Sequence, residues 1–206
     1  MASTEIPAPS GPPEEPPVRK PRKVFLLVGV IVAVALGIGL FTNLGNNPKT
    51  DPAPHVGGTL PTFSGTYLNG HGSVDVPGNG VGGGSPAVLL FFGKWCPQCH
   101  LELPPLAKAI REQQAAGGAL SRVRIVGVDS EDTVANAKSF IKSSGVDFPV
   151  AYDPNLGVTE GDFYFEGDPD AVFVKADGKI ARIVRGNVLT PAAFTADERE
   201  IIPSGT

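Results

Sequence analysis

The sequence contains very little cysteine. Cys96 and Cys99 are its two cysteines, three positions apart in a chain of 206 residues. A small secreted scaffold that depends on disulfides needs more of them, spread along the chain so that they close long loops. A bridge between these two residues would close almost no loop and would constrain the unfolded chain very little. The pair is therefore expected to serve chemistry rather than to stabilise the fold.

Metal and haem ligands are also scarce. A structural zinc site needs four ligands, and no second Cys/His pair at finger spacing accompanies Cys96, Cys99 and His100. Segment 96–100 does match the Cys-x-x-Cys-His pattern of covalent c-type haem attachment, so a haem carrier is one alternative. The single methionine, Met1, precedes the long apolar run, which separates it from segment 96–100. If that run spans a membrane, Met1 lies on the opposite side from the motif and is not available as an axial haem ligand. We expect neither a metal nor an organic cofactor.

The chain also lacks an excess of positive charge. Its formal net charge is -4, and residues 1–23 hold four Lys/Arg against three Asp/Glu, leaving 13 against 18 in the rest. An acidic remainder of this kind disfavours a phosphate-binding surface, so we expect no nucleic-acid partner. The length suits one domain with appendages.

What is present begins with an N-terminal targeting region. Residues 1–23 are rich in proline and have no apolar periodicity, which predicts a disordered tail. Residues 24–41 form an uninterrupted run of apolar residues and glycine, and with residues 42–44 the run approaches the about 20 residues that span a bilayer. Residues 45–56 read as a linker, because they are rich in Pro, Asn and Gly.

The flanks of the apolar run predict its orientation. Basic residues precede it and asparagines follow it, so the positive-inside rule keeps the tail in the cytoplasm and exports the remainder; the basic residues are Arg19, Lys20, Arg22 and Lys23. The competing interpretation is a cleaved signal peptide, because Ala33-Val34-Ala35 resembles a cleavage site. That triplet lies inside the run, so we favour a single-pass anchor in the cell membrane.

Residues 57–206 show the alternation of an α/β domain. A hairpin is predicted from segments 62–68 and 73–76 around an Asn-Gly-His-Gly turn. Strands are then expected at 87–92, 123–128, 171–174 and 180–184, and helices at 101–116, 133–143 and from Thr190 or Thr195 to Ile202. Strands that alternate with helices and end in a hairpin and a helix predict a mixed sheet flanked by helices.

The Cys-x-x-Cys segment directly follows the first buried strand and opens a helix. Unpaired N–H groups and the positive end of the helix dipole favour a thiolate at Cys96. Cys99, one turn along, is close enough to resolve a mixed disulfide between Cys96 and a substrate. We therefore expect Cys96 to be the exposed nucleophile and Cys99 the more buried resolving thiol. An inert structural disulfide is an alternative, but it would explain neither Trp95 nor the position at a helix start.

At these residues the sequence resembles a known family. Trp95-Cys96-x-x-Cys99, with Glu102 three residues and Pro104 five residues after Cys99, repeats the WCxxCxxExP signature. The exported part is similar to the thioredoxin superfamily, in particular the TlpA/ResA-type tethered oxidoreductases that include cytochrome c maturation thioredoxins. The resemblance covers about residues 57–194 and implies a thioredoxin-like fold with an N-terminal hairpin.

The resemblance also implies a substrate-binding loop. Gly167-Asp168-Pro169 matches the family's Gly-x-Pro, so Pro169 is expected to be a cis-proline that faces the dithiol. Trp95, Pro97, Asp168 and Pro169 are then the expected substrate-binding residues. The chain departs from the family by placing acids on both sides of the proline. Asp168 and Asp170 are expected either to oppose thiolate formation at Cys96 or simply to point to solvent.

Glu102 is the third candidate catalytic residue, with Cys96 and Cys99. Positions i and i+3 share a helix face, so Glu102 can approach Cys99 and accept its proton when that thiol attacks. The alternative is an ordinary surface carboxylate.

Together these features predict a membrane-tethered extracytoplasmic thiol–disulfide oxidoreductase. Its partners would be protein thiols or disulfides and a membrane redox protein, and cytochrome c maturation is one role that the resemblance implies. A different class of function is a tethered binding module in which the disulfide takes no part.

The orientation of the anchor is directly testable. Protease added to right-side-out vesicles is expected to remove the domain and to spare an epitope at residue 2, because the basic flank keeps the tail inside. Immunoblotting with antibodies to the two ends measures this. Digestion of the N-terminal epitope instead would contradict the orientation.

Overall fold

The computed structural model describes residues 53–70, 72–78 and 81–202. The predicted tail, the predicted membrane helix and most of the predicted linker lie outside these residues. Within the described part of the chain, none of the helices has the length and apolar character needed to cross a bilayer.

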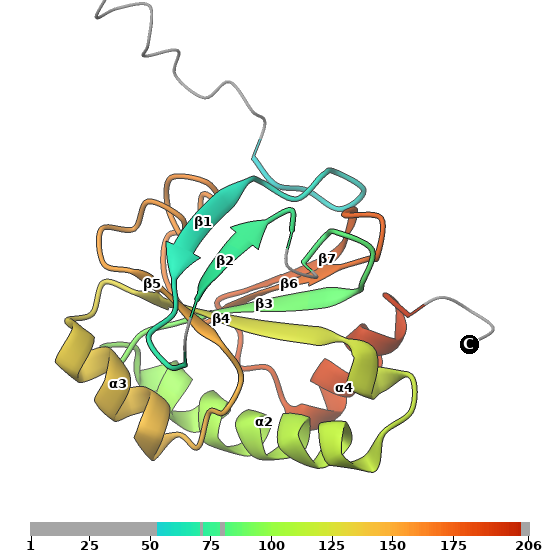
Figure 1. Cartoon of the computed structure of the whole chain (residues 1–206). Helices are drawn as coiled ribbons and strands as arrows, with labels where there is room; N and C mark the ends of the chain where they lie inside the picture. The colour runs from blue at the N-terminus through green and yellow to red at the C-terminus, as the bar shows by residue number, and fades with distance from the viewer. Residues whose placement is uncertain (1–52, 71, 79–80, 203–206) are drawn as a thin grey trace, which may run out of the picture. The chain divides into compact units, whose positions relative to one another are not determined.

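A five-stranded mixed sheet forms the centre of the domain (Figure 1). Its strands are β3 (Ala87–Phe92), β4 (Arg124–Ser130), β5 (Val150–Asp153), β6 (Asp170–Val174) and β7 (Ile180–Arg185). The spatial order is β5-β4-β3-β6-β7, with β3, β4 and β5 parallel and β6 and β7 antiparallel to their neighbours. The predicted mixed sheet is confirmed. β5 was not predicted, because it is a four-residue edge strand without apolar alternation.

Both faces of this sheet are covered, which explains why β3 is apolar at every position. Val88, Leu90 and Phe92 belong to the core on the helix side. Ala87, Leu89 and Phe91 belong to the core on the side of the N-terminal hairpin. That hairpin consists of β1 (Phe63–Thr66) and β2 (Ser73–Val76), and it was predicted correctly.

The helices begin where capping side chains are available. α2 (Pro97–Ala116) starts at Pro97 with Cys96 as its N-cap, which confirms that the Cys-x-x-Cys segment opens the helix; the helix-like range 101–116 had left out its first turn. α3 (Val134–Ser143) is capped by Thr133 and α4 (Pro191–Arg199) by Thr190, whose hydroxyl oxygens accept N–H groups of the first turn. All three helices lie on one face of the sheet, and the β1–β2 hairpin covers the other (Figure 1). A single 3₁₀ turn, η1 (Leu120–Arg122), leads into β4.

Phe163 joins the hairpin to the central sheet. Its side chain is fully buried, and its ring centroid lies 4.9 Å from that of Phe91 on β3 and 6.0 Å from that of Phe63 on β1. The loop between β5 and β6 thus supplies an aromatic ring to the core shared by both sheets.

Phe163→Ala is expected to lower the free energy of unfolding by about 3–5 kcal/mol, because it leaves a cavity in a close-packed aromatic cluster. Urea unfolding followed by circular dichroism measures the change. Leu101→Ala is the matched control: Leu101 is 70 % exposed, and its truncation is expected to change stability by no more than about 0.5 kcal/mol. Equal effects of the two substitutions would contradict the assignment of Phe163 to the core.

Candidate functional site

The two cysteines form a disulfide at the start of α2. The segment 93–96 leaves the end of β3 and turns directly into this helix. As the N-cap residue, Cys96 places its Sγ 3.0 Å from the backbone nitrogen of Cys99, which donates a hydrogen bond to it. A sulfur that receives an N–H at a helix N-terminus is stabilised as a thiolate once the disulfide is reduced.

Both cysteines are buried, with exposed fractions of 0 % for Cys96 and 1 % for Cys99. The expectation of an exposed Cys96 is therefore wrong for the disulfide form. The physical reason is the loop before β6, whose Asp168 carbonyl oxygen lies 3.4 Å from Cys96 Sγ. Pro97 and Gln98, between the two cysteines, remain exposed.

Hydrogen bonds to the end of β4 and to the residues that follow it fix the loop that carries Cys96. Trp95 Nε1 donates a hydrogen bond to the carbonyl oxygen of Ser130 at 2.9 Å, and the Lys94 backbone N–H donates to Asp132 Oδ2 at 2.6 Å. Gly93 is required here, because a Cβ would collide with Trp95 Nε1 and come within 2.8 Å of the Ser130 carbonyl oxygen. Trp95 nevertheless leaves 45 % of its surface exposed beside the disulfide.

The bond between Asp168 and Pro169 is cis, as the resemblance implied. It places the Asp168 carbonyl against Cys96, and Pro169 itself is buried. The four expected substrate-binding residues come from two segments that meet at the disulfide: Trp95 and Pro97 from the junction of β3 and α2, and Asp168 and Pro169 from the loop before β6.

The acids around Pro169 do not point freely to solvent, which excludes that one of the two alternatives. Asp168 Oδ2 accepts a hydrogen bond from Ser130 Oγ at 2.5 Å, and Asp170 Oδ1 accepts one from the Gly186 N–H at 2.8 Å. Burial raises the pKa of Asp168 to about 7 and that of Asp170 to about 6, and these hydrogen bonds offset part of the rise.

Glu102 is also buried, which excludes the alternative of a surface carboxylate. Its exposed fraction is 6 %, and its Oε2 accepts a hydrogen bond from the Leu189 N–H at 2.8 Å. Burial raises its pKa to about 7, against the lowering effect of that bond. Glu102 and Cys99 lie three positions apart on α2, and both side chains are on its buried face.

Sequence reasoning missed the polar end of β4. Asp129 is fully buried, and neither of its carboxylate oxygens has a hydrogen-bond partner among the described residues. Burial raises its pKa to about 8, helped by the nearby charges of Asp132 and Asp168. The sequence feature that could have revealed this is the Asp129-Ser130 pair directly after the predicted strand 123–128. In the structure the strand continues to Ser130, so both polar residues belong to its buried end.

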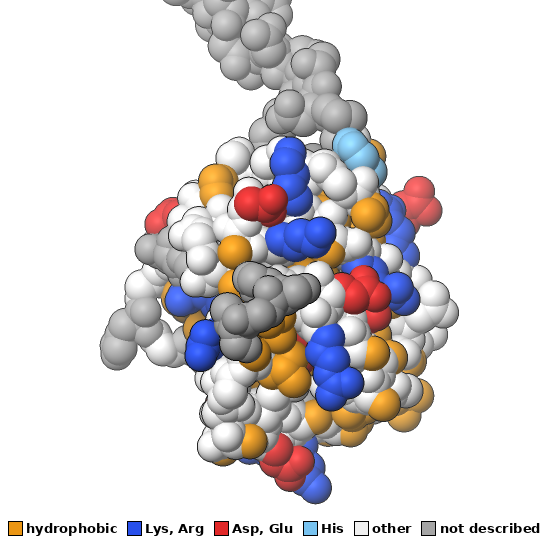
Figure 2. All heavy atoms as spheres, turned by 90° about the vertical axis from the view of Figure 1, so that its right-hand side faces the viewer, with side chains coloured by type: hydrophobic (Ala, Val, Ile, Leu, Met, Phe, Trp, Pro, Cys, Tyr) orange, Lys and Arg blue, Asp and Glu red, His pale blue; other side chains and the backbone are white. Residues whose placement is uncertain are grey.

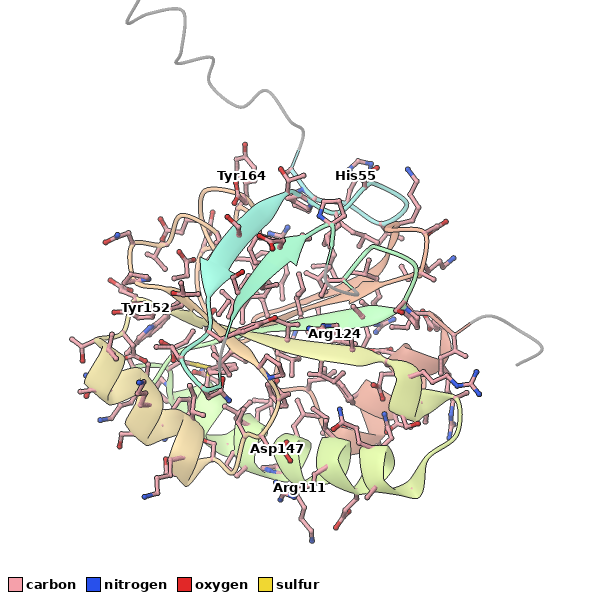
Figure 3. The ribbon with its side chains drawn as sticks, viewed as in Figure 1. His55, Arg111, Arg124, Asp147, Tyr152 and Tyr164 are labelled. Carbon is pink, nitrogen blue, oxygen red and sulfur yellow. A yellow bond between two sulfur atoms is a disulfide. The ribbon has the colours of Figure 1, made fainter. Side chains whose placement is uncertain are left out.

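Histidine and tyrosine side chains near the site have structural contacts. His100 Nε2 lies 2.7 Å from the Lys94 carbonyl oxygen, and its ring lies 4.5 Å from that of Phe140. Tyr152, labelled beside α3 in Figure 3, donates a hydrogen bond to the Asp132 carbonyl oxygen.

Within residues 53–70, 72–78 and 81–202, no group of three or more His, Cys, Asp or Glu side chains could hold a metal ion.

A separate open cleft of about 350 Å³ lies at the other end of the sheet, where the β6–β7 turn meets the end of α4. Its charged lining mixes Lys175 and Lys179 with Asp177 and Glu200. Figure 2, which views the domain from the right-hand side of Figure 1, shows basic and acidic side chains interspersed over this face. The cleft contains no cysteine and takes no part in the disulfide site.

Comparison with known proteins agrees with this geometry. The model of the AhpC/TSA family matches residues 56–183. The chain belongs to the AhpC/TSA family. The soluble secreted antigen MPT53 of Mycobacterium tuberculosis is 31 % identical over 149 residues, which are 72 % of this chain and 76 % of that protein. The thiol-disulfide oxidoreductase ResA of Bacillus subtilis is 26 % identical over 175 residues, 83 % of this chain and 89 % of ResA.

Solved structures show the same similarity. DsbF of MTB, in mixed oxidized and reduced forms, is 26 % identical with a TM-score of 0.56, covering 68 % of this chain and 94 % of that one. A secreted M. tuberculosis disulfide oxidoreductase homologous to E. coli DsbE is 25 % identical with a TM-score of 0.55, covering 66 % and 94 %. This AhpC/TSA protein is a thioredoxin-like thiol–disulfide oxidoreductase of the TlpA/ResA type.

The buried Asp129 generates a prediction about stability and pH. Its pKa in the folded protein, about 8, lies above the ordinary value of 3.8, so its favourable contribution is complete below about pH 4 and is lost as the pH rises through 8. Asp129→Asn removes this ionisation. It is expected to be more stable than wild type at pH 9, by more than about 1 kcal/mol, and nearly equal to it below pH 4.

Urea midpoints measured from pH 4 to 9 test this. Asp147→Asn is the control, because Asp147 is exposed and pairs with Arg111 on the outer side of α2 (Figure 3). A pH profile for Asp129→Asn that runs parallel to wild type would show that Asp129 is charged in the folded protein.

Proposed function

We propose that this AhpC/TSA protein is tethered to the cell membrane and exchanges disulfides with extracytoplasmic proteins through its Cys96-Pro97-Gln98-Cys99 dithiol. The observation that carries the proposal is the position of Cys96 Sγ, which lies between a donor and a substrate-binding loop. The Cys99 N–H approaches it at 3.0 Å and the carbonyl oxygen before cis-Pro169 at 3.4 Å. The membrane tether rests on the predicted span 24–44.

The exchange runs through a mixed disulfide. The Cys96 thiolate attacks a substrate disulfide, and the substrate thiolate leaves. Cys99 then attacks Cys96 Sγ, which closes the protein disulfide and releases the second substrate thiolate. In the reverse direction the same steps oxidise a substrate dithiol.

Glu102 serves the resolving step in this scheme. It follows Cys99 by three positions on the buried face of α2, and its carboxyl has a pKa of about 7. It can therefore accept the Cys99 proton near neutral pH and return it in the reverse direction.

The surface around the disulfide suits a protein substrate. Trp95 on the active-site loop, Leu101 on α2, Val134 at the start of α3 and Val188 before α4 are among the large apolar side chains that the domain exposes. A substrate segment that reaches Cys96 would bury part of this surface and pair with the backbone before Pro169.

Two extracytoplasmic roles follow from the resemblance. Reduction of apocytochrome c during cytochrome c maturation is one, and general maintenance of exported thiols is the other. Either role needs a membrane redox partner that returns the Cys96–Cys99 pair to its starting state.

The order of attack is testable by trapping. Cys99→Ser is expected to accumulate mixed disulfides with substrate proteins, because Cys96 can attack but nothing resolves the product. Cys96→Ser is expected to trap no mixed disulfides, because Cys99 lies inside the first turn of α2, where a substrate disulfide does not reach it. Non-reducing gels after acid quenching and alkylation measure the adducts.

Equal trapping by both variants would contradict the assigned roles. If a strain that carries Cys96→Ser retains full function, the protein acts as a binding module instead. A Soret band in the purified protein would identify a haem carrier.

A further inference from the structure

Asp168 touches two parts of the redox site at once. Its main-chain oxygen lies 3.4 Å from Cys96 Sγ, and its carboxylate Oδ2 lies 2.5 Å from Ser130 Oγ. The other carboxylate oxygen, Oδ1, is buried and has no hydrogen-bond partner among the described residues. The residue therefore contacts the redox-active sulfur through its backbone and the end of β4 through its side chain.

The hydrogen atoms around Ser130 can be counted. Ser130 Oγ lies 2.5 Å from Asp168 Oδ2 and 3.3 Å from the Phe92 carbonyl oxygen, and its single O–H can serve only one of them. If the Asp168 carboxyl is ionised, Oδ2 accepts the hydrogen of Ser130 Oγ. If Oδ2 carries a proton, it donates to Ser130 and Ser130 donates to Phe92, so both contacts are satisfied. The observed arrangement therefore allows Asp168 to be ionised or to hold a proton.

The surrounding acids favour the protonated form of Asp168. Asp129, next to Ser130 on β4, is fully buried with two unpartnered oxygens, and an unpaired buried carboxylate is costly. Other acids also face Asp168 or share its cleft, namely Asp132, Asp153, Asp170, Glu131, Glu160 and Glu166. Arg185 acts on Asp170, and its guanidinium lies over the Phe165 ring.

We propose that Asp168 takes up a proton when the Cys96–Cys99 disulfide is reduced. This inference rests on the proposed dithiol exchange and adds a second proton acceptor to it. A partner dithiol supplies two electrons and two protons and becomes a disulfide. The S–S bond of the protein breaks to give a Cys96 thiolate and a Cys99 thiol. One proton goes to Cys99, and the other goes to the Asp168 carboxylate, which offsets the new negative charge on Cys96.

The coupling has a defined pH window. In the disulfide form burial raises the pKa of Asp168 to about 7 and that of Asp129 to about 8, so below about pH 6 both carboxyls already hold protons. Reduction then adds no proton to them. Above that pH the carboxyls are increasingly ionised, and a thiolate at Cys96 draws a proton onto Asp168. The reduction potential should therefore fall more steeply with pH above 7 than below 6, so the protein becomes a stronger reductant.

The test is redox equilibration of the purified full-length protein in detergent with glutathione from pH 5.5 to 8.5. The slope of the midpoint potential against pH gives the number of protons taken up per two electrons. Between pH 7 and 8 this number is expected to approach two in wild type and one in Asp168→Asn. In the reduced proteins, the pH dependence of Cys96 alkylation by iodoacetamide is expected to show two steps in wild type and a single step at lower pH in Asp168→Asn.

Two further variants separate proton uptake from a merely structural role. Asp147→Asn removes an exposed charge that pairs with Arg111 on α2, outside the Asp168 cleft, and is expected to behave as wild type. Ser130→Ala keeps the carboxyl but removes the hydrogen bond that lowers its pKa, so the steep part of the profile should remain and move to higher pH.

An Asp168→Asn protein with the wild-type slope and alkylation profile would overturn the inference while leaving the exchange reaction intact. If the wild-type Cys96–Cys99 pair does not equilibrate with glutathione at all, the proposed function itself is wrong. The two failures are therefore distinguishable.

Discussion

The hydrogen bond from the Cys99 N–H to Cys96 Sγ, 3.0 Å long, is the contact on which the site depends. It exists because β3 ends directly before a helix whose N-cap is a cysteine, so that the reactive sulfur takes the place that a Ser or Asp oxygen usually fills. The helix then supplies both the resolving thiol and the N–H that stabilises the thiolate. The rest of the domain keeps this strand–helix junction in position.

The surrounding acids oppose that stabilisation. Glu102 on α2 and Asp129 on β4 are buried, Asp168 in the loop before β6 is half-buried, and desolvation raises the pKa of each carboxyl. As neutral groups they are compatible with a thiolate, and as charged groups they destabilise it. The redox behaviour of the dithiol is thus tied to the protonation of its neighbours, and Asp168 is the one whose backbone also contacts the sulfur.

Local patterns were sufficient for most of the architecture. The hairpin, the buried strand β3, helix α3 and the Thr cap of α4 could each be predicted from neighbouring residues, because periodicity and capping act within a few positions. The start of α2 at Cys96 was predicted from the motif, although the helix-like range 101–116 left out the first turn, where Pro97 takes the first helical position. The edge strand β5 was missed because its four residues become a strand only by pairing with β4.

The sequence alone determined the chemistry: a Cys-x-x-Cys after a buried strand, with Trp95 before it and Glu102 after it, specifies a redox-active helix start. Only the tertiary structure decided the electrostatic surroundings of that dithiol. Asp129 and Asp168 are 39 positions apart in the chain, and the fold brings them close enough for their charges to interact. Whether a carboxyl faces water or a closed interior depends on how loops from different strands pack together, and a linear pattern does not contain that information.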